Sequence, residues 1–104
     1  MGSPVETSEK RAYELIYVLQ PELDQQGVQS VDEAVQGVIA RQDGEVTDTE
    51  LWGKRTLAYP IEKHVDGIYI LHRLSMPGTA LTEIERSLRF NEDVLRFLCF
   101  RTDE

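Results

Sequence analysis

The order in which strand and helix patterns alternate constrains this chain more than any other feature. Dense apolar runs rich in β-branched and aromatic residues predict strands, and apolar residues at helical spacing predict helices. The first five of these runs end at Gly, Pro or Asn, which are typical of turns. The predicted elements are strands at 12–20, 45–59, 67–76 and 94–101, and helices around 31–39 and 81–88. Their order is β-α-β-β-α-β.

This order predicts an α+β ferredoxin-like sandwich, because two right-handed crossovers joined by a hairpin form the split βαβ unit. Its four-stranded antiparallel sheet has two helices on one face, and the first and third strands lie in its centre. The other face has no helix to cover it. Its apolar side chains are therefore expected to remain solvated, to dimerise or to bind a partner.

Local signals place the ends of the predicted elements. Ser30 followed by Glu33 matches a capping box and predicts the start of the first helix. Gly44 is expected to end that helix in a left-handed conformation. A bulge is expected at Gly53, and Pro60 is expected to begin a loop that reaches Asp66-Gly67.

The chain has 104 residues, which is enough for one domain with a modest core. We assign this domain to residues 11–102, with a polar, disordered leader at 1–10 and a short tail at 103–104. No apolar run approaches the 18 or more residues of a membrane span. The single cysteine, Cys99, excludes an intrachain disulfide and is typical of a reducing, cytoplasmic compartment.

The net charge of −8 is confined to the first half of the chain. Residues 1–50 hold three basic and eleven acidic groups, whereas residues 51–104 hold eight of each. Nucleic-acid binding draws on Lys and Arg, so this chain is a poor candidate for binding RNA without a partner. The separation of charge nevertheless favours a polarised molecule that binds phosphate on one side.

Catalytic and metal-binding constellations are not evident in the sequence. His64 and His72 lack the further ligands that a metal site needs, so neither a metal nor another cofactor is expected. Cys99 lies in an apolar strand without a nearby base and is interpreted as structural. The segment Val35-Gln36-Gly37-Val38, followed by Arg41, is similar to a phosphate-binding signature of acylphosphatases. That signature belongs in a loop, whereas here it falls within the predicted helix.

Three other segments resemble a different family. They are the run from Tyr13-Glu14 to Pro21, the run Trp52-Gly53-Lys54-Arg55-Thr56-Leu57-Ala58-Tyr59-Pro60-Ile61, and the run Arg89-Phe90-Asn91-Glu92-Asp93-Val94-Leu95-Arg96. Together they resemble the family of the sixth protein of the bacterial small ribosomal subunit over about residues 11–102. The resemblance implies the same ferredoxin-like fold and no catalytic activity. It further implies pairing with the small basic ribosomal protein S-eighteen and joint binding to the central domain of 16S ribosomal RNA.

The resemblance also indicates site residues. Basic side chains expected to contact RNA are Lys10, Arg11, Lys54, Arg55, Arg86, Arg89 and Arg96. Trp52 and Tyr59 are assigned to partner contact. For Trp52 itself, the residue type favours core packing, with a platform for a partner or a base as the alternative. Tyr59-Pro60 is expected to shape the exit from the strand.

Two other functions remain open. One is a homodimer with a small-molecule pocket on the uncovered face, for which Tyr17, Trp52 and His72 are candidate lining residues. The other is the acylphosphatase-like hydrolase. The ribosomal interpretation expects instead a monomer that waits for its partner.

Overall fold

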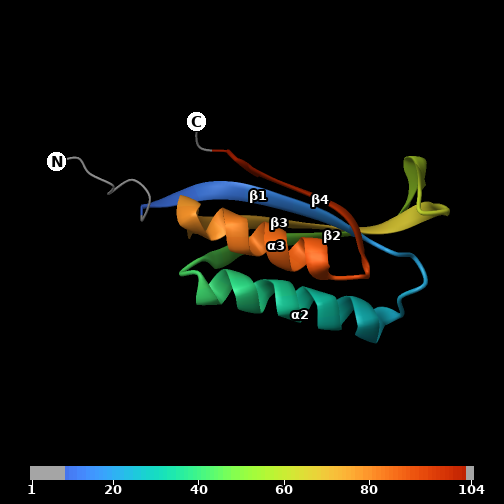
Figure 1. Ribbon diagram of the computed structural model, residues 1–104, viewed down its shortest axis with the longest axis horizontal. Coiled ribbons are helices and arrows are strands. Elements are labelled where there is room, and N and C mark those ends of the chain that lie inside the picture. The colour runs from blue at the N-terminus through green and yellow to red at the C-terminus, as the bar shows by residue number, and fades with distance from the viewer. Residues whose placement is uncertain (1–8, 103–104) are drawn as a thin grey trace.

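The computed structural model describes residues 9–102 of the chain. Four antiparallel strands form one sheet in the order β2-β3-β1-β4, and both helices lie on the same side of it (Figure 1). This confirms the predicted ferredoxin-like α+β sandwich with the first and third strands in its centre. The elements are β1 (Lys10–Leu19), α2 (Gln25–Arg41), β2 (Glu45–Ile61), β3 (His64–Pro77), the 3₁₀ turn η1 (Gly78–Ala80), α3 (Leu81–Phe90) and β4 (Val94–Arg101).

The hydrophobic core lies between the helices and one face of the sheet. Helix α2 contributes Val31, Val35 and Ile39, which recur every four residues and so share one face. Helix α3 contributes Ile84 and Leu88 by the same spacing. The sheet contributes Tyr13, Leu15, Tyr17, Leu19, Ile70, Leu74 and Met76.

Helix α2 begins earlier than predicted. Asp24 is its N-cap, and the Asp24 carboxylate accepts a hydrogen bond of 2.7 Å from the backbone N–H of Gly27. Ser30 lies inside the helix, so the capping-box interpretation is wrong. At the other end, Asp43 and not Gly44 takes the positive φ, at 64°. The N–H of Gly44 bonds to Ile39 O at 2.9 Å.

The loop predicted after Tyr59 is also wrong, because β2 and β3 continue as one long hairpin. Only Glu62 and Lys63 form the turn, with φ of 49° and 74°. Positive φ at both positions fits a type I′ hairpin turn, which usually carries Asn-Gly. Gly67 lies within β3, where a Cβ would collide with the side chain of Val18. In Figure 1 the hairpin extends beyond the ends of both helices.

Several other expectations are confirmed. Gly53 has a φ of 79° at a shift in the β2–β3 register, Asn91 caps the end of α3, and β4 has the predicted bounds. The predicted leader and tail lie largely outside the described residues, and Lys10 is already in β1. Among residues 9–102, neither helix has the length and apolar composition that crossing a membrane requires.

Candidate nucleic-acid and partner interface

The sheet face opposite the helices, here called the open face, changes in charge and polarity along its strands. Residues paired across antiparallel strands share a face, so the open face can be described as rows. One row, which lies next to the end row of Glu45, Ser75 and Ala12, contains Asp48, Arg73, Glu14 and Phe100. The next contains Glu50, Leu71, Ile16 and Leu98, and the third contains Gly53, Tyr69, Val18 and Arg96.

The first row is acidic although it contains an arginine. Arg73 lies 2.9 Å from the Asp48 carboxylate, 2.7 Å from that of Glu50 and 3.4 Å from that of Glu14. Hydrogen bonds from Trp52 and Arg73 hold the pKa of Glu50 below its ordinary value. Three carboxylates share one guanidinium, so this acidic end retains a negative charge at neutral pH.

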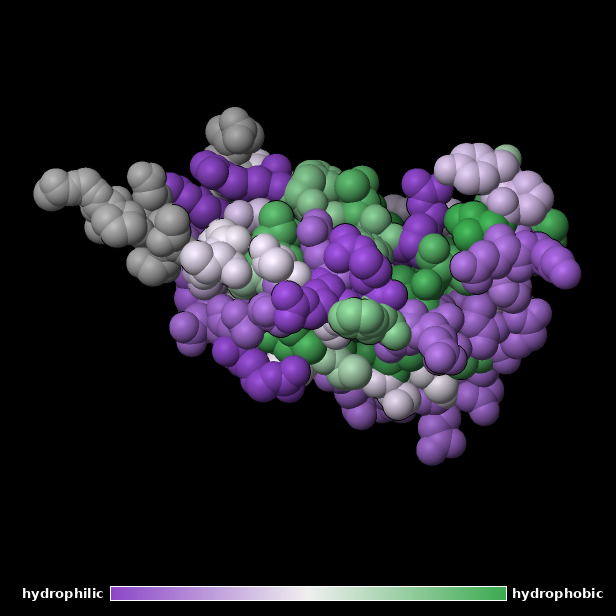
Figure 2. Space-filling model, in the orientation of Figure 1, coloured by the Kyte–Doolittle hydropathy of each residue, from purple (hydrophilic) through white to green (hydrophobic). Residues whose placement is uncertain are grey.

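The middle of the open face is apolar and partly exposed. Leu98 is 58% exposed and Phe100 is 39% exposed, because β4 is an edge strand whose outer face no helix covers. A shallow hollow of about 170 Å³ lies beside Leu98, with Ile16 and Val18 in its lining. Figure 2 shows apolar side chains in green along the upper edge of the molecule, away from α2. Such a patch is typical of a surface that binds a partner.

The opposite end of the open face combines aromatic rings with arginines, and we call it the cationic end. Trp52 stacks on Tyr69 at 6.1 Å between ring centroids, and the Arg55 guanidinium lies 5.1 Å from the Trp52 centroid. Arg96 donates a 3.0 Å hydrogen bond to the Tyr59 hydroxyl and lies 5.8 Å from its ring. These contacts hold the guanidinium groups of Arg55 and Arg96 against aromatic rings. Such cation–π contacts order a cationic side chain and leave its charge available.

Tyr59 reaches Arg96 because the long hairpin folds over the open face. The two residues lie on opposite edge strands, β2 and β4, yet their side chains meet. The contact therefore closes one end of the open face. Tyr59 remains 58% exposed, so its ring is accessible to a second molecule.

Trp52 does not lie in the core beneath the helices, so the core interpretation is wrong. It is half-buried on the open face, which is the position that a platform requires. Lys54 and Arg55 are both exposed on the edge strand β2. Lys54 pairs with Ile68, which packs against the core, so it lies on the face opposite Arg55. The two adjacent cations therefore do not form one site.

The remaining basic candidates fall into two groups. Arg86 and Arg89 are exposed on α3, and the Arg89 guanidinium lies 5.6 Å from the Phe97 ring, on the helix side of β4 next to Arg96 in sequence. Lys10 and Arg11 lie at the start of β1, and Lys10 precedes Val18, which is in the row of Arg96, by eight residues. At about 3.3 Å per residue this is about 26 Å along the sheet. One compact surface therefore cannot include all seven predicted cations.

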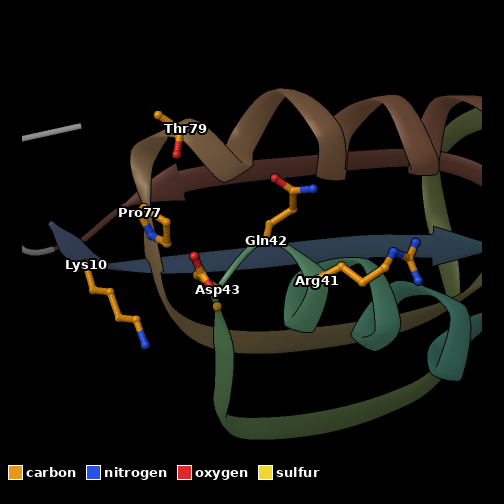
Figure 3. Close-up of a pocket in the computed structure, with 7 residues that line it drawn as sticks. Lys10, Arg41, Gln42, Asp43, Pro77 and Thr79 are labelled. Atoms are coloured by element: carbon orange, nitrogen blue, oxygen red, sulfur yellow. The ribbon is translucent and has the colours of Figure 1, made fainter. Parts of the chain in front are cut away.

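A polar pocket of about 530 Å³ lies at the Lys10 end of the molecule. Lys10 and Arg41 both line it, but in Figure 3 their side chains do not converge on one point. Asp43 places a carboxylate between them. Arg41 extends back along α2 toward Gly37, and the whole acylphosphatase-like segment is helical. The pocket therefore lacks the converging cations and exposed backbone N–H groups of a phosphate-binding loop.

Tyr17 and His72 do not lie on the open face, so the pocket predicted from them is wrong. Both are fully buried on the helix side of the sheet. The Tyr17 hydroxyl donates to Asp32 Oδ1 at 2.6 Å, and His72 Nε2 lies 2.7 Å from the same oxygen. Thr49 Oγ1 lies 2.9 Å from His72 Nδ1. Every buried side-chain N or O atom of the described residues has a partner, so this cluster needs no ligand.

The cluster shifts the pKa values of two of its members. Burial raises the pKa of Tyr17, and the adjacent Asp32 carboxylate raises it further. Burial alone would raise the pKa of Asp32, but hydrogen bonds from His72 and Tyr17 outweigh it, so the pKa is lowered. Burial raises the pKa of Cys99 to about 12, with a further contribution from Glu85. A thiol in that state is protonated at neutral pH, as the structural interpretation expects.

The sequence predicted an uncovered face but missed most of the residues that define it. Tyr69, Leu98 and the Arg73 cluster became visible only once the register was known. Successive side chains of a strand point to opposite faces, so the sequence of β3 could have placed Tyr69 and Arg73 together on one face. No cluster of three or more His, Cys, Asp or Glu side chains suited to a metal occurs among residues 9–102.

Comparisons with known proteins agree on one family. The family model described as Ribosomal protein S6 matches residues 12–101. The small ribosomal subunit protein bS6 of Natranaerobius thermophilus is 40% identical over 94 residues, covering 90% of this chain and 98% of the relative. That of Mycobacterium tuberculosis is 38% identical, with 90% and 98% covered. The crystal structure of the 30S ribosomal protein S6 from Thermotoga maritima aligns with a TM-score of 0.85 at 26% identity, covering 90% of this chain and 89% of that one.

Proposed function

The chain belongs to the ribosomal protein S6 family, and on that premise we propose that it binds the central domain of 16S ribosomal RNA together with the basic ribosomal protein S-eighteen. As a member of this family it is a structural constituent of the small ribosomal subunit in the cytoplasm and not an enzyme. Free of the ribosome, the chain is a monomer. The partner occupies the acidic end and apolar middle of the open face, and RNA contacts the cationic end.

The gradient along the open face is the observation that carries this proposal. At one end Glu14, Asp48 and Glu50 outnumber Arg73. This arrangement complements a cationic protein, and complementary charge steers association and fixes orientation. The adjacent apolar row, with Leu98 exposed, offers the buried contact area that charge alone does not supply.

RNA binding fits the other end of the same face. Arg55 and Arg96 lie against aromatic rings there, and Arg89 lies nearby on α3. Guanidinium groups bind phosphate and stack on bases. Since the whole chain carries a charge of −8, these few cations act against long-range repulsion from RNA. A basic partner on the acidic end neutralises part of that repulsion, so the pair binds RNA more tightly than the chain alone.

The positions of the side chains do not support the alternative, a homodimer with a small-molecule pocket on the open face. Tyr17 and His72, two of the three residues that were to line its pocket, are buried core residues. Sedimentation of the free chain separates the two possibilities. A monomer at micromolar concentration agrees with the proposal, whereas a stable dimer contradicts it.

Calorimetric titration of the chain with S-eighteen tests the partner surface. Neutralising Asp48→Asn with Glu50→Gln is expected to weaken the pair roughly 3- to 10-fold at low salt, and less at high salt. Both carboxylates are exposed enough that the fold tolerates the change. The matched control is Glu33→Gln with Asp43→Asn, two exposed carboxylates away from the open face. Equal affinities for the two double variants would contradict the proposed surface.

A further inference from the structure

Phe90 is the most exposed of the large hydrophobic side chains in the described part of the chain, at 78%. Its position on α3 explains why. Ile84 and Leu88 bury the core-facing side of the helix, and Phe90 follows Leu88 by two residues, or roughly 200° around the helix. The ring therefore points away from the core. Folding leaves most of its surface in water, so hydrophobic burial within this chain does not account for it.

The backbone on which Phe90 lies is firmly held. It is the last residue of α3, and the turn after it is closed by hydrogen bonds from Asp93 N to Asn91 Oδ1 at 2.9 Å and from Val94 N to Asn91 O at 3.1 Å. Gln20, which follows β1, donates to Asp93 from both its backbone and its side chain. A ring on so rigid a support loses little backbone entropy when it binds.

Two arginines accompany the ring. Arg86 precedes Phe90 by four residues and so lies on the same side of α3. Its contact with Glu83 is loose, at 3.6 Å, and its side chain is 60% exposed. Arg89 is exposed beside the Phe97 ring and has no ion pair with another described residue. Both guanidinium groups are therefore available to a phosphate chain that passes over Phe90.

Phe90 also lies near the cationic end. The turn after it leads directly into Val94, which pairs with Leu19 at the end of β1. Arg96 follows two residues later in β4 and pairs with Val18. Phe90 lies on the helix side of the sheet and Arg96 on the open face, so an RNA strand that contacts both passes around the edge strand β4.

We propose that Phe90 is a stacking platform for an unpaired base of the bound RNA, with Arg86 and Arg89 holding the flanking phosphates. This inference rests on the proposed RNA-binding function and adds a base contact to it. Exposed aromatic rings beside cations are the usual means of holding single-stranded nucleic acid. An apolar protein partner could bind an aliphatic side chain at position 90 as well as an aromatic one, and such a partner would not need Arg86 and Arg89.

The test compares side chains that differ in whether they have an aromatic face. The pair of this chain with S-eighteen is titrated into a 16S central-domain fragment. Phe90→Ala is expected to weaken binding about 5- to 100-fold, as loss of one stacked base does. Phe90→Leu keeps most of the apolar area and is expected to bind as weakly as Phe90→Ala, whereas Phe90→Tyr retains binding. Leu51→Ala is the matched control, since it removes an exposed apolar side chain (70%) from β2, beside a hollow whose lining contains no arginine.

Each outcome decides the inference. Weak binding by both the Ala and Leu variants, with unchanged association between the two proteins, supports the stacking platform. Binding restored by Leu, or weakened association with S-eighteen, would assign Phe90 to a protein contact and overturn it. Unchanged RNA affinity in Phe90→Ala overturns this inference alone. Failure of the unaltered pair to bind the fragment overturns both this inference and the proposed function.

Discussion

His72 Nε2 and Asp32 Oδ1 lie 2.7 Å apart and join the centre of the sheet to helix α2. The His72 side chain is fully buried, and that of Asp32 is 21% exposed. The same Asp32 oxygen accepts the Tyr17 hydroxyl at 2.6 Å, while Gln36 donates to the other oxygen at 2.8 Å. The Tyr17 hydroxyl and His72 Nε2 lie 3.4 Å from one another, so the Asp32 carboxylate supplies the shorter contact to each of these two buried groups, and its role is structural.

Asp32→Asn is expected to lower the free energy of unfolding by about 1–3 kcal/mol at neutral pH, because charge-assisted hydrogen bonds to buried groups are lost. The pKa of Asp32 is lowered in the folded state. Its contribution is therefore complete above the unfolded pKa of about 3.9 and is lost as the pH falls through the lower folded value. Urea unfolding measured from pH 7 down to pH 3 tests this. An Asp32→Asn curve parallel to wild type would contradict the account.

Tyr17→Phe removes only the hydroxyl and is expected to cost about 0.5–1.5 kcal/mol. Since Tyr17 and Asp32 share one hydrogen bond, the double variant should cost less than the two single variants together. A double-mutant cycle from urea unfolding gives this coupling. Additivity within about 0.3 kcal/mol would mean that the bond contributes nothing to stability.

Gly44→Ala is expected to destabilise the fold by about 1–3 kcal/mol through overpacking. A Cβ at Gly44 would lie 2.9 Å from both Ile39 Cγ2 and Met76 Cβ, and the rigid core leaves neither much room to move. Gly37→Ala is the matched control. Its Cβ would meet only the end of Arg41 at 3.6 Å, so this helix-interior change should stabilise the protein by about 0.5–1 kcal/mol. Thermal unfolding of both variants compares them, and equal effects would contradict the close packing of Gly44 against Ile39 and Met76.

The cationic end makes a prediction about salt. For the pair on RNA, Arg55→Gln with Arg96→Gln should reduce the slope of log affinity against log salt by about one unit per lost phosphate contact. Lys10→Gln with Arg41→Gln removes equal charge at the other end of the sheet and should leave the slope nearly unchanged. Equal slopes for the two double variants would contradict the assignment of RNA to the cationic end.

The sequence predicted the element order and the uncovered face, but not which residues lie on that face. Strand β1 is apolar at every position from Leu15 to Leu19, so alternation could not decide whether Tyr17 faces the helices. The hairpin turn at Glu62-Lys63 lacks the Asn-Gly signal of its type, while Asp66-Gly67 carries a turn signal within a strand. Gly67 is required there by close packing against Val18, which no local pattern records.

The cation–aromatic contacts depended on tertiary structure even more. Arg96 and Tyr59 are 37 residues apart and meet only because the hairpin folds over the sheet. The resemblance in the sequence indicated both residues as functional, but it could not show that they touch. Phe90 was part of a matching segment, yet only its exposure in the folded chain marks it as a surface residue.

The most direct test of the account is a binding titration against a 16S central-domain fragment at moderate salt, with and without S-eighteen. The charge of −8 and the small number of cations on the open face predict that binding is much tighter when the basic partner is present. Equally tight binding by the chain alone would contradict this central claim, and so would failure to bind with the partner present.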